Sequence, residues 1–274
     1  MHRALVATAG LLAATVTALV TTVGLAAPGR AIIGGQPDTT HDNVGVLLPT
    51  AASPVARWCG VTPVSPTVVV LAGHCASLRL ANFGETDGDI TFDPRFLDSL
   101  GDRASGWAYT GSWPTYHGTL AAHPLYDGKG SDYDVAVMVL DEPIPGVDVE
   151  ALPAAGLLDD LKAAGTLRAQ PMTLVGYGTT ARLPGNGFVG GGYRQTAEQT
   201  MQSLGAAIVK HKGADGSSTC IYDSGSPLFV GDQLIGVLSA GDAACSTLSI
   251  SARLDVPAVR SWLLAQVEGA AGAA

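Results

Sequence analysis

The stretch Cys220-Ile221-Tyr222-Asp223-Ser224-Gly225-Ser226-Pro227 holds a serine whose neighbours suit a nucleophile. Ser224 stands between an aspartate and a glycine, on a tight turn bracketed by a cysteine and a proline. A serine hydroxyl is a weak nucleophile near neutral pH, and it needs a neighbouring base and donors that face the developing oxyanion. A working site would therefore also need a histidine, a carboxylate and a fold that brings them to Ser224.

Two candidate partners precede Ser224 in the chain. His74 lies in Leu71-Ala72-Gly73-His74-Cys75, and Asp134 begins Asp134-Val135-Ala136-Val137. An imidazole titrates in the working pH range, so His74 could take the serine proton, and Asp134 could fix the histidine tautomer. Asp132 is the alternative carboxylate, but the register of the strand that follows favours Asp134. The other candidate histidines lack such neighbours and are interpreted as structural or surface residues: His41, His117, His123 and His211.

The order of the three residues indicates the kind of scaffold. Histidine before aspartate before serine, on a β-rich chain, is typical of a scaffold with two β-barrels. An α/β-hydrolase would place the serine first, in a Gly-x-Ser-x-Gly turn among alternating helices, and the sequence has neither feature. The active residues would then lie between two barrels.

Short apolar runs separated by turn residues predict the strands that would position these side chains. The clearest alternation of apolar and polar residues covers residues 248–254. Only the C-terminal segment predicts a helix, with Asp255 as its cap, Pro257 in its first turn, and Val259, Leu263 and Val267 near helical spacing. The remaining predicted strands are residues 44–48, 67–71, 135–140, 172–175, 206–209 and 234–238.

Composition supports an all-β chain. The 274 residues are 47% hydrophobic and 14% charged and include 35 glycines and 16 prolines, which favours many short strands over long helices. This length suits one compact unit or two small packed domains, and residues 141–160 are the best internal linker. The net charge of −9 disfavours nucleic acid and anionic membranes as partners.

The first 31 residues are typical of a secretory signal, which could be followed by a short propeptide that a second enzyme removes. His2 and Arg3 precede an uncharged apolar run, and small residues at Ala26, Ala27 and Ala31 could each precede a cleavage site. The run is long enough to span a bilayer, so an uncleaved anchor is the alternative, although its Ala, Thr and Gly content makes it a weak span. We expect a secreted, extracellular protein with no stable membrane association after cleavage.

Four cysteines in an exported chain suggest two disulfides. Three pairings are possible, and the local one joins Cys59 to Cys75 and Cys220 to Cys245. No cluster of histidine and cysteine has zinc spacing. The acidic residues Glu85, Asp87, Asp89 and Asp93 lack a calcium-loop pattern and suggest a solvated loop. The sequence therefore predicts neither a metal nor a cofactor.

Taken together, the motifs resemble those of the trypsin/chymotrypsin-like serine proteases over nearly all of residues 32–268. The resemblance implies two packed six-stranded antiparallel β-barrels with a C-terminal helix. Residues 32–145 would form the first barrel, with His74 and Asp134, and residues 146–274 the second, with Ser224. The resemblance rests on the His, Asp and Ser motifs and on further matching segments: Ile32-Ile33-Gly34-Gly35, Cys59, Gly176-Tyr177-Gly178, Ser239-Ala240-Gly241 and Cys245.

The same resemblance implies a role for each matching residue. His74, Asp134 and Ser224 would be the catalytic triad, and the backbone amides of Tyr222 and Ser224 would form the oxyanion hole. The freed amine of Ile32 would pair with Asp223, and the two disulfides would be the local ones. The substrate pocket would be formed by Ser218, Thr219, Ser239, Gly241 and Ser249.

The sequence departs from the family pattern at three places. Tyr222 and Ser226 stand where the family has glycine, and Ala31 separates Arg30 from Ile32. The pocket floor at Ser218 carries no carboxylate, which predicts a small to medium apolar side chain before the scissile bond rather than Lys or Arg.

We expect a monomeric secreted serine endopeptidase that acts on protein or peptide substrates and is open to proteinaceous inhibitors. A catalytically impaired homologue that serves as a binding or regulatory module is the alternative.

Overall fold

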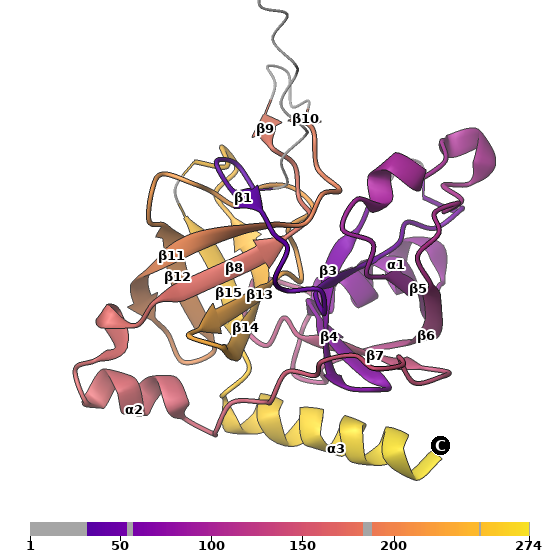
Figure 1. The fold of residues 1–274 in the computed structure, drawn as a ribbon. Coiled ribbons are helices and arrows are strands. Elements are labelled where there is room, and N and C mark those ends of the chain that lie inside the picture. Colours follow the sequence, from indigo (N-terminus) through magenta and orange to yellow (C-terminus); the bar gives the residue numbers. More distant parts are fainter. Residues whose placement is uncertain (1–31, 54–56, 183–187, 247, 274) are drawn as a thin grey trace, which may run out of the picture.

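The strands of the protein form two closed antiparallel barrels, as Figure 1 shows for the computed structural model. The structure describes residues 32–53, 57–182, 188–246 and 248–273. The first barrel has the strand order β2-β3-β4-β7-β6-β5. Its strands are β2 (Gly45–Leu47), β3 (Cys59–Ser65), β4 (Val68–Leu71), β5 (Asp87–Thr91), β6 (Thr115–Ala122) and β7 (Ala136–Leu140).

The second barrel closes where β8 pairs with both β13 and β11. A short strand near the N-terminus, β1 (Gln36–Pro37), extends this sheet beside β11, and β9 (Ala181–Arg182) pairs separately with β10 (Phe188–Val189). Two six-stranded antiparallel barrels are thus confirmed. The second is built from β8 (Met172–Gly176), β11 (Gln195–Leu204), β12 (Ile208–Gly213), β13 (Pro227–Val230), β14 (Gln233–Gly241) and β15 (Ser249–Arg253).

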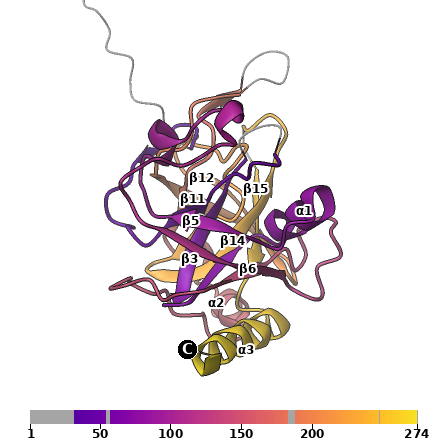
Figure 2. The same cartoon turned by 90° about the vertical axis from the view of Figure 1, so that its right-hand side faces the viewer.

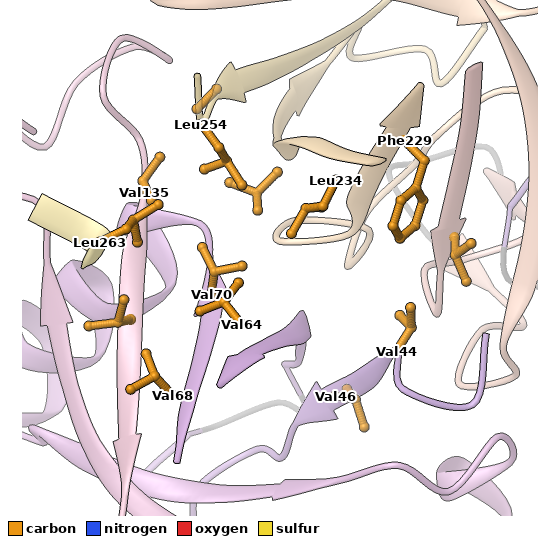
Figure 3. Packing of buried hydrophobic residues seen from close by; sticks show 14 of the residues in the cluster. Val44, Val46, Val64, Val68, Val70, Val135, Phe229, Leu234, Leu254 and Leu263 are labelled. Carbon is orange, nitrogen blue, oxygen red and sulfur yellow. The ribbon is translucent and has the colours of Figure 1, made fainter. Parts of the chain in front are cut away.

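Strand β4 explains how the barrels pack together. All four of its residues are buried, which its Val-Val-Val-Leu sequence suits. Because side chains alternate along a strand, Val69 and Leu71 point into the first barrel, while Val68 and Val70 pack toward the second. Figure 3 shows this interface, where Val68 and Val70 share a cluster with Leu234, Leu254 and other residues of the second barrel.

The structure contains two helices that the sequence did not predict. Helix α1 (Gly73–Phe83) follows β4 directly and ends at Gly84, whose φ of 70° is left-handed and whose amide donates to the Leu80 carbonyl. Leu78 and Leu80 are exposed, so α1 has no clean apolar stripe by which to recognise it. Helix α2 (Leu157–Ala163) begins inside the predicted linker.

The predicted C-terminal helix is confirmed as α3 (Pro257–Ala273), but its predicted cap is wrong. The Asp255 carboxylate accepts from the Leu158 amide in α2 and pairs with Arg253. Helix α3 lies beneath the barrels in Figures 1 and 2 and packs against β4 and β7. No helix in the described ranges is long and apolar enough to cross a membrane. Short 3₁₀ turns cover Phe96–Ser99, Arg103–Ser105 and Leu167–Ala169.

Candidate active site

His74 and Asp134 meet because β4 and β7 are neighbours. Leu71 at the end of β4 pairs with Ala136 at the start of β7, so the residues just beyond these two ends lie together. Asp134 accepts the His74 amide on Oδ1 at 2.6 Å, and its Oδ2 lies 2.7 Å from His74 Nδ1. Gly73 leaves room for this contact, because a Cβ there would lie 3.0 Å from Asp134 Oδ1.

A third donor reaches the same carboxylate from the second barrel. The Ser239 hydroxyl on β14 donates to Asp134 Oδ2 at 2.6 Å, and Asp134 is fully buried. Sequence analysis placed Ser239 in the substrate pocket; it does line the cleft, but its hydroxyl points to the carboxylate. With Nδ1 held by Asp134, Nε2 is the His74 nitrogen left for proton transfer.

Ser224 shares a cavity with His74. The cavity holds about 500 Å³ between the barrels, and both residues line it. The serine turn is attached to the first barrel, because the Gly60 amide donates to the Ser224 carbonyl at 2.7 Å. Gly60 permits this approach, since a Cβ there would lie 2.8 Å from the Ser226 nitrogen. Residues from both barrels thus surround one cavity that contains the half-buried Ser224.

The backbone before Ser224 is arranged as a donor pair. Within the described chain, the amides of Tyr222 and Ser224 donate to no protein group, which leaves two N–H groups beside the nucleophile. Tyr222 has a φ of 72°, in the left-handed region. A non-glycine residue there costs roughly 1–2 kcal/mol. The Tyr222 ring packs against Trp58, with ring centroids 4.2 Å apart.

Asp223 is buried inside the second barrel and bonded by backbone donors. Its Oδ1 accepts from the Gly178 amide at 2.8 Å and its Oδ2 from the Cys220 amide at 2.9 Å. Glycine is needed at positions 176 and 178, because a Cβ at either would lie within 2.4 Å of an Asp223 side-chain atom. Burial raises the pKa of Asp223 to about 7, although the two backbone donors act in the opposite direction.

Ile32 and Asp223 are not paired in this structure, in which Ile32 still follows Ala31 in the chain. Ile32 is fully buried, and its backbone nitrogen donates to Gln195 Oε1 at 3.2 Å. The next residue, Ile33, forms an antiparallel bridge with Ser218. In the uncut chain the Ile32 nitrogen is an uncharged amide, whereas the expected ion pair needs the amine that cleavage would free. The pair therefore stays a prediction for the processed chain.

The predicted substrate pocket is neutral. Thr219 and Gly241 line the cavity, while Ser218 and Ser249 are buried. Ser249 Oγ lies 2.8 Å from Thr219 Oγ1, and the Ser218 hydroxyl donates to the Thr219 carbonyl at 3.2 Å. Asp242 also lines the cavity, but its carboxylate accepts backbone amides from the loop that follows, including that of Leu248 at 2.9 Å.

Both disulfides border the cavity. Cys59–Cys75 joins β3 to α1, and Cys220–Cys245 joins the serine turn to the loop after β14. Cys59, His74 and Cys75 lie close enough together to suggest a metal site, but sulfurs in a disulfide are not thiolate ligands.

The acidic loop is only partly solvated, contrary to expectation. Asp93 is buried and accepts a hydrogen bond from the Tyr109 hydroxyl at 2.7 Å. Each of the other four histidines in the described ranges has a partner within the fold: His41 bonds Asp38, His117 bonds Asp89, His123 contacts Trp262, and His211 bonds Gln199.

Trp58 and Leu78 are among the residues that line the cleft but were not predicted from the sequence. Trp58 is buried beside the serine turn, and Leu78 lines the cavity although 49% of it is exposed. The signal for Trp58 was its place directly before Cys59, while Leu78 could be placed only once α1 was known to be a helix.

A cleft between two antiparallel barrels, with His and Asp from one and Ser from the other, defines the class of two-barrel serine peptidases. The family model described as Trypsin matches residues 32–263. The chain therefore belongs to the trypsin family.

Named relatives agree with this assignment. The chain is 26% identical over 261 residues to Trypsin theta of Drosophila melanogaster, covering 85% of each protein. It is 26% identical over 229 residues to a trypsin of Saccharopolyspora erythraea, covering 77% of this chain and 87% of that one. A solved structure described as that of GrC matches with a TM-score of 0.65 at 17% identity, covering 86% of this chain and 100% of that chain, which shows the shared fold.

Proposed function

We propose that this protein is a secreted serine endopeptidase that cleaves peptide bonds through an acyl-enzyme. The observation that carries the proposal is the hydrogen-bonded group of His74, Asp134 and Ser239, which borders the same cavity as Ser224. Two free backbone amides beside the serine supply the donors that such chemistry needs.

The proposed mechanism uses only groups in the cleft. Ser224 Oγ attacks the scissile carbonyl carbon while His74 Nε2 takes its proton, and the oxyanion receives hydrogen bonds from the Tyr222 and Ser224 amides. As the intermediate collapses, the C–N bond breaks and His74 gives its proton to the leaving amine. Water then attacks the acyl-enzyme, again with His74 as base, and Ser224 is released. Asp134 stabilises the imidazolium that forms in each half.

The neutral pocket supports a preference for a small to medium apolar residue before the scissile bond. Thr219, Ser218 and Ser249 contribute only hydroxyls, two of them bonded to each other. A buried carboxylate that would pair with Lys or Arg is absent from these positions. Substrates in the proposal are proteins or peptides, and proteinaceous inhibitors would bind the same cleft.

Two features support secretion and processing. The two disulfides suit an oxidising compartment. The expected signal lies in residues 1–31, outside the described residues. Removal of this segment would free the Ile32 amine, and its proposed partner is the buried Asp223 carboxylate.

A second candidate is a catalytically impaired homologue that acts as a binding module. Two observations favour it: Tyr222 holds a strained left-handed conformation, and the buried Ser226 hydroxyl has no hydrogen-bond partner among the described residues. Both residues stand where the family has glycine. A glycine at position 222 would adopt the left-handed φ without strain, and a glycine at position 226 would bury no hydroxyl.

Labelling with a fluorophosphonate tests the two candidates directly. The purified chain that starts at Ile32 is expected to take one adduct by intact mass, while the Ser224→Ala variant takes none. N-terminal sequencing verifies the start of each sample. An unlabelled wild type with an Ile32 start would contradict the endopeptidase and favour the binding module.

A further inference from the structure

We propose that Trp58 is a positioning residue that holds the oxyanion turn in its left-handed form through the ring of Tyr222. The inference rests on the proposed endopeptidase function and explains how this chain can keep a tyrosine where the family has glycine. The two rings lie 4.2 Å apart between centroids, with 35° between their planes.

Trp58 is a fixed platform. It is 6% exposed, and its indole Nε1 donates to the Tyr177 carbonyl at 3.0 Å. Phe96 meets its ring edge-on at 5.3 Å and also packs against Tyr177 at 5.9 Å. An indole with a bonded N–H and a buried aromatic neighbour has little freedom to move, so a ring stacked on it is held too.

The two residues after Trp58 attach the first barrel to the histidine helix and to the serine turn. Cys59 forms its disulfide with Cys75 beside His74, and the Gly60 amide bonds the Ser224 carbonyl. Three consecutive residues thus touch the serine turn or the histidine helix. A movement of the Tyr222 ring relative to Trp58 would therefore be a movement relative to the whole catalytic group.

The conformation of Tyr222 links its ring to the chemistry. Its φ of 72° sets the direction of its own N–H relative to Ser224, and that N–H has no other protein partner in the described chain. A glycine adopts this φ freely, whereas a tyrosine needs a compensating interaction. The half-buried Tyr222 ring on Trp58 is such an interaction, because aromatic pairing contributes an energy comparable to the strain.

The test is a set of substitutions at both positions, in chains that start at Ile32. Tyr222→Phe keeps the ring, Tyr222→Ala keeps only the strain, and Tyr222→Gly removes both ring and strain. We expect kcat to fall about 10- to 100-fold in Tyr222→Ala, a part of the effect of losing an oxyanion donor. KM should stay nearly constant. Phe should retain the wild-type kcat, and Gly should recover most of the loss.

Two further measurements separate positioning from general packing. A peptide aldehyde, whose adduct with Ser224 places an oxygen at the oxyanion position, should lose affinity by the same factor as kcat. Trp58→Leu should lower kcat in the wild type but change it less than about threefold in the Tyr222→Gly background, as coupled residues do. Tyr116→Ala is the matched control, because Tyr116 is a half-buried tyrosine packed on Phe92 away from the cleft.

Several results would overturn the inference. A Tyr222→Ala variant as active as Tyr222→Phe would show that the ring does not hold the turn. A Tyr222→Gly variant far more active than wild type would show that the ring obstructs the site. If Trp58→Leu fails to fold, the Tyr222 series alone decides. A wild-type chain that starts at Ile32 and takes no fluorophosphonate would overturn the proposed function and the inference with it.

Discussion

At the scale of single residues, the proposed catalytic carboxylate, Asp134, accepts a hydrogen bond from the opposite barrel. Asp134 accepts from the His74 amide, the His74 ring and the Ser239 hydroxyl. A buried carboxylate with three donors has a fixed orientation, so the imidazole bonded to it is fixed as well. In the proposed mechanism, Ser239 therefore acts on the reaction through two other side chains, Asp134 and His74.

Removal of the Ser239 hydroxyl should lower turnover more than substrate binding. We expect Ser239→Ala to reduce kcat about tenfold, which corresponds to the loss of one hydrogen bond to a charged group. Steady-state kinetics on a peptide ester and a peptide amide would measure it. Ser249→Ala is the control, because Ser249 bonds Thr219 in the pocket and should change KM instead. A larger KM effect in Ser239→Ala would contradict this role.

Asp223 should make the stability of the uncut chain depend on pH. Its pKa is about 7 in this chain, against an ordinary value of 3.8, because burial disfavours the charged form. The folded state therefore binds the proton more tightly than the unfolded state, and its stabilisation fades as pH rises from about 4 through 7. A freed Ile32 ammonium would reverse this by favouring the carboxylate.

Thermal unfolding of two chains in the Ser224→Ala background checks this linkage. One chain keeps Pro28-Gly29-Arg30-Ala31 before Ile32, and the other starts at Ile32. We expect the Tm advantage of the shorter chain to grow between pH 5 and 8, with roughly 2–4 °C for each kcal/mol in a chain of this size. Asp223→Asn in both chains should remove the trend. A pH-independent difference would show that the amine does not reach Asp223.

The residue types of the site could be predicted where the signal is local in sequence. His74, Asp134 and Ser224 each stand in a short motif, and the structure brings His74 and Asp134 into contact and places Ser224 on their cavity. The Ser239 hydroxyl bond and the Trp58 platform could not be predicted, because both arise from contacts between the two barrels. No spacing along the chain encodes such a contact.

At the scale of elements, helix α1 forms one wall of the cleft. His74 and Leu78 are four residues apart, so they lie on the same face of the helix, and Asn82 continues that face. All three line the cavity. Leu80 is 56% exposed on the same helix but does not line it. Because Leu78 is exposed beside the proposed catalytic histidine, we propose that it contacts an apolar substrate side chain.

Leu78 and Leu80 offer a matched comparison of this wall. Leu78→Ala should raise KM for peptide substrates several-fold, because up to ~1.5–3 kcal/mol of apolar burial is available to a bound side chain. Leu80→Ala is the control and should leave KM unchanged. The free energy of unfolding of both variants should lie within about 0.5 kcal/mol of the wild-type value, since both positions are exposed. Kinetics on a peptide library together with urea unfolding would measure both effects. Equal KM values in the two variants would contradict a role for α1 in substrate recognition.

The predicted strands follow apolar residues, and polar residues or proline account for two of the strands that were missed. All seven predicted strand segments overlap strands of the structure. Strand β11 was missed because its buried face includes Gln195 and Gln199, whose amides are bonded rather than apolar. Strand β3 contains Pro63, and a proline normally argues against a strand. The strand tolerates this proline because Pro63 lies where the pairing with β4 shifts register.

At the scale of the whole molecule, a buried ionic group ties three elements together. Arg253 in β15 bonds Asp255, which precedes α3, and Asp159 in α2. Asp255 is fully buried and also accepts a hydrogen bond from the Leu158 amide in the first turn of α2. The side chain of Asp159, in contrast, is 62% exposed. The two carboxylates contact one guanidinium but differ in access to water.

That difference predicts unequal effects on global stability. Asp255→Ala should destabilise the protein by about 3–5 kcal/mol, because it leaves a buried guanidinium short of its partner. Asp159→Ala should cost less than about 1 kcal/mol, as for exposed pairs. Urea unfolding in the Ser224→Ala background, which prevents self-cleavage, gives both values. Similar losses in the two variants would contradict the proposed importance of burial.

The global architecture followed from the order of the motifs rather than from any single element. Histidine, aspartate and serine in that order indicated two barrels, and the strand pairings form two. The contacts that link the two barrels could not be predicted, because they join segments distant in sequence. Strand β1 pairs with β11, and helix α3 packs against β4 and β7.

The placement of the disulfides has a consequence for where the molecule can work. Both bridges border the cavity of the proposed active site, one beside His74 and the other on the serine turn. A thiol reductant would remove one covalent link from each of these two walls. The proposed peptidase activity is therefore expected only in an oxidising compartment, where both bridges can form.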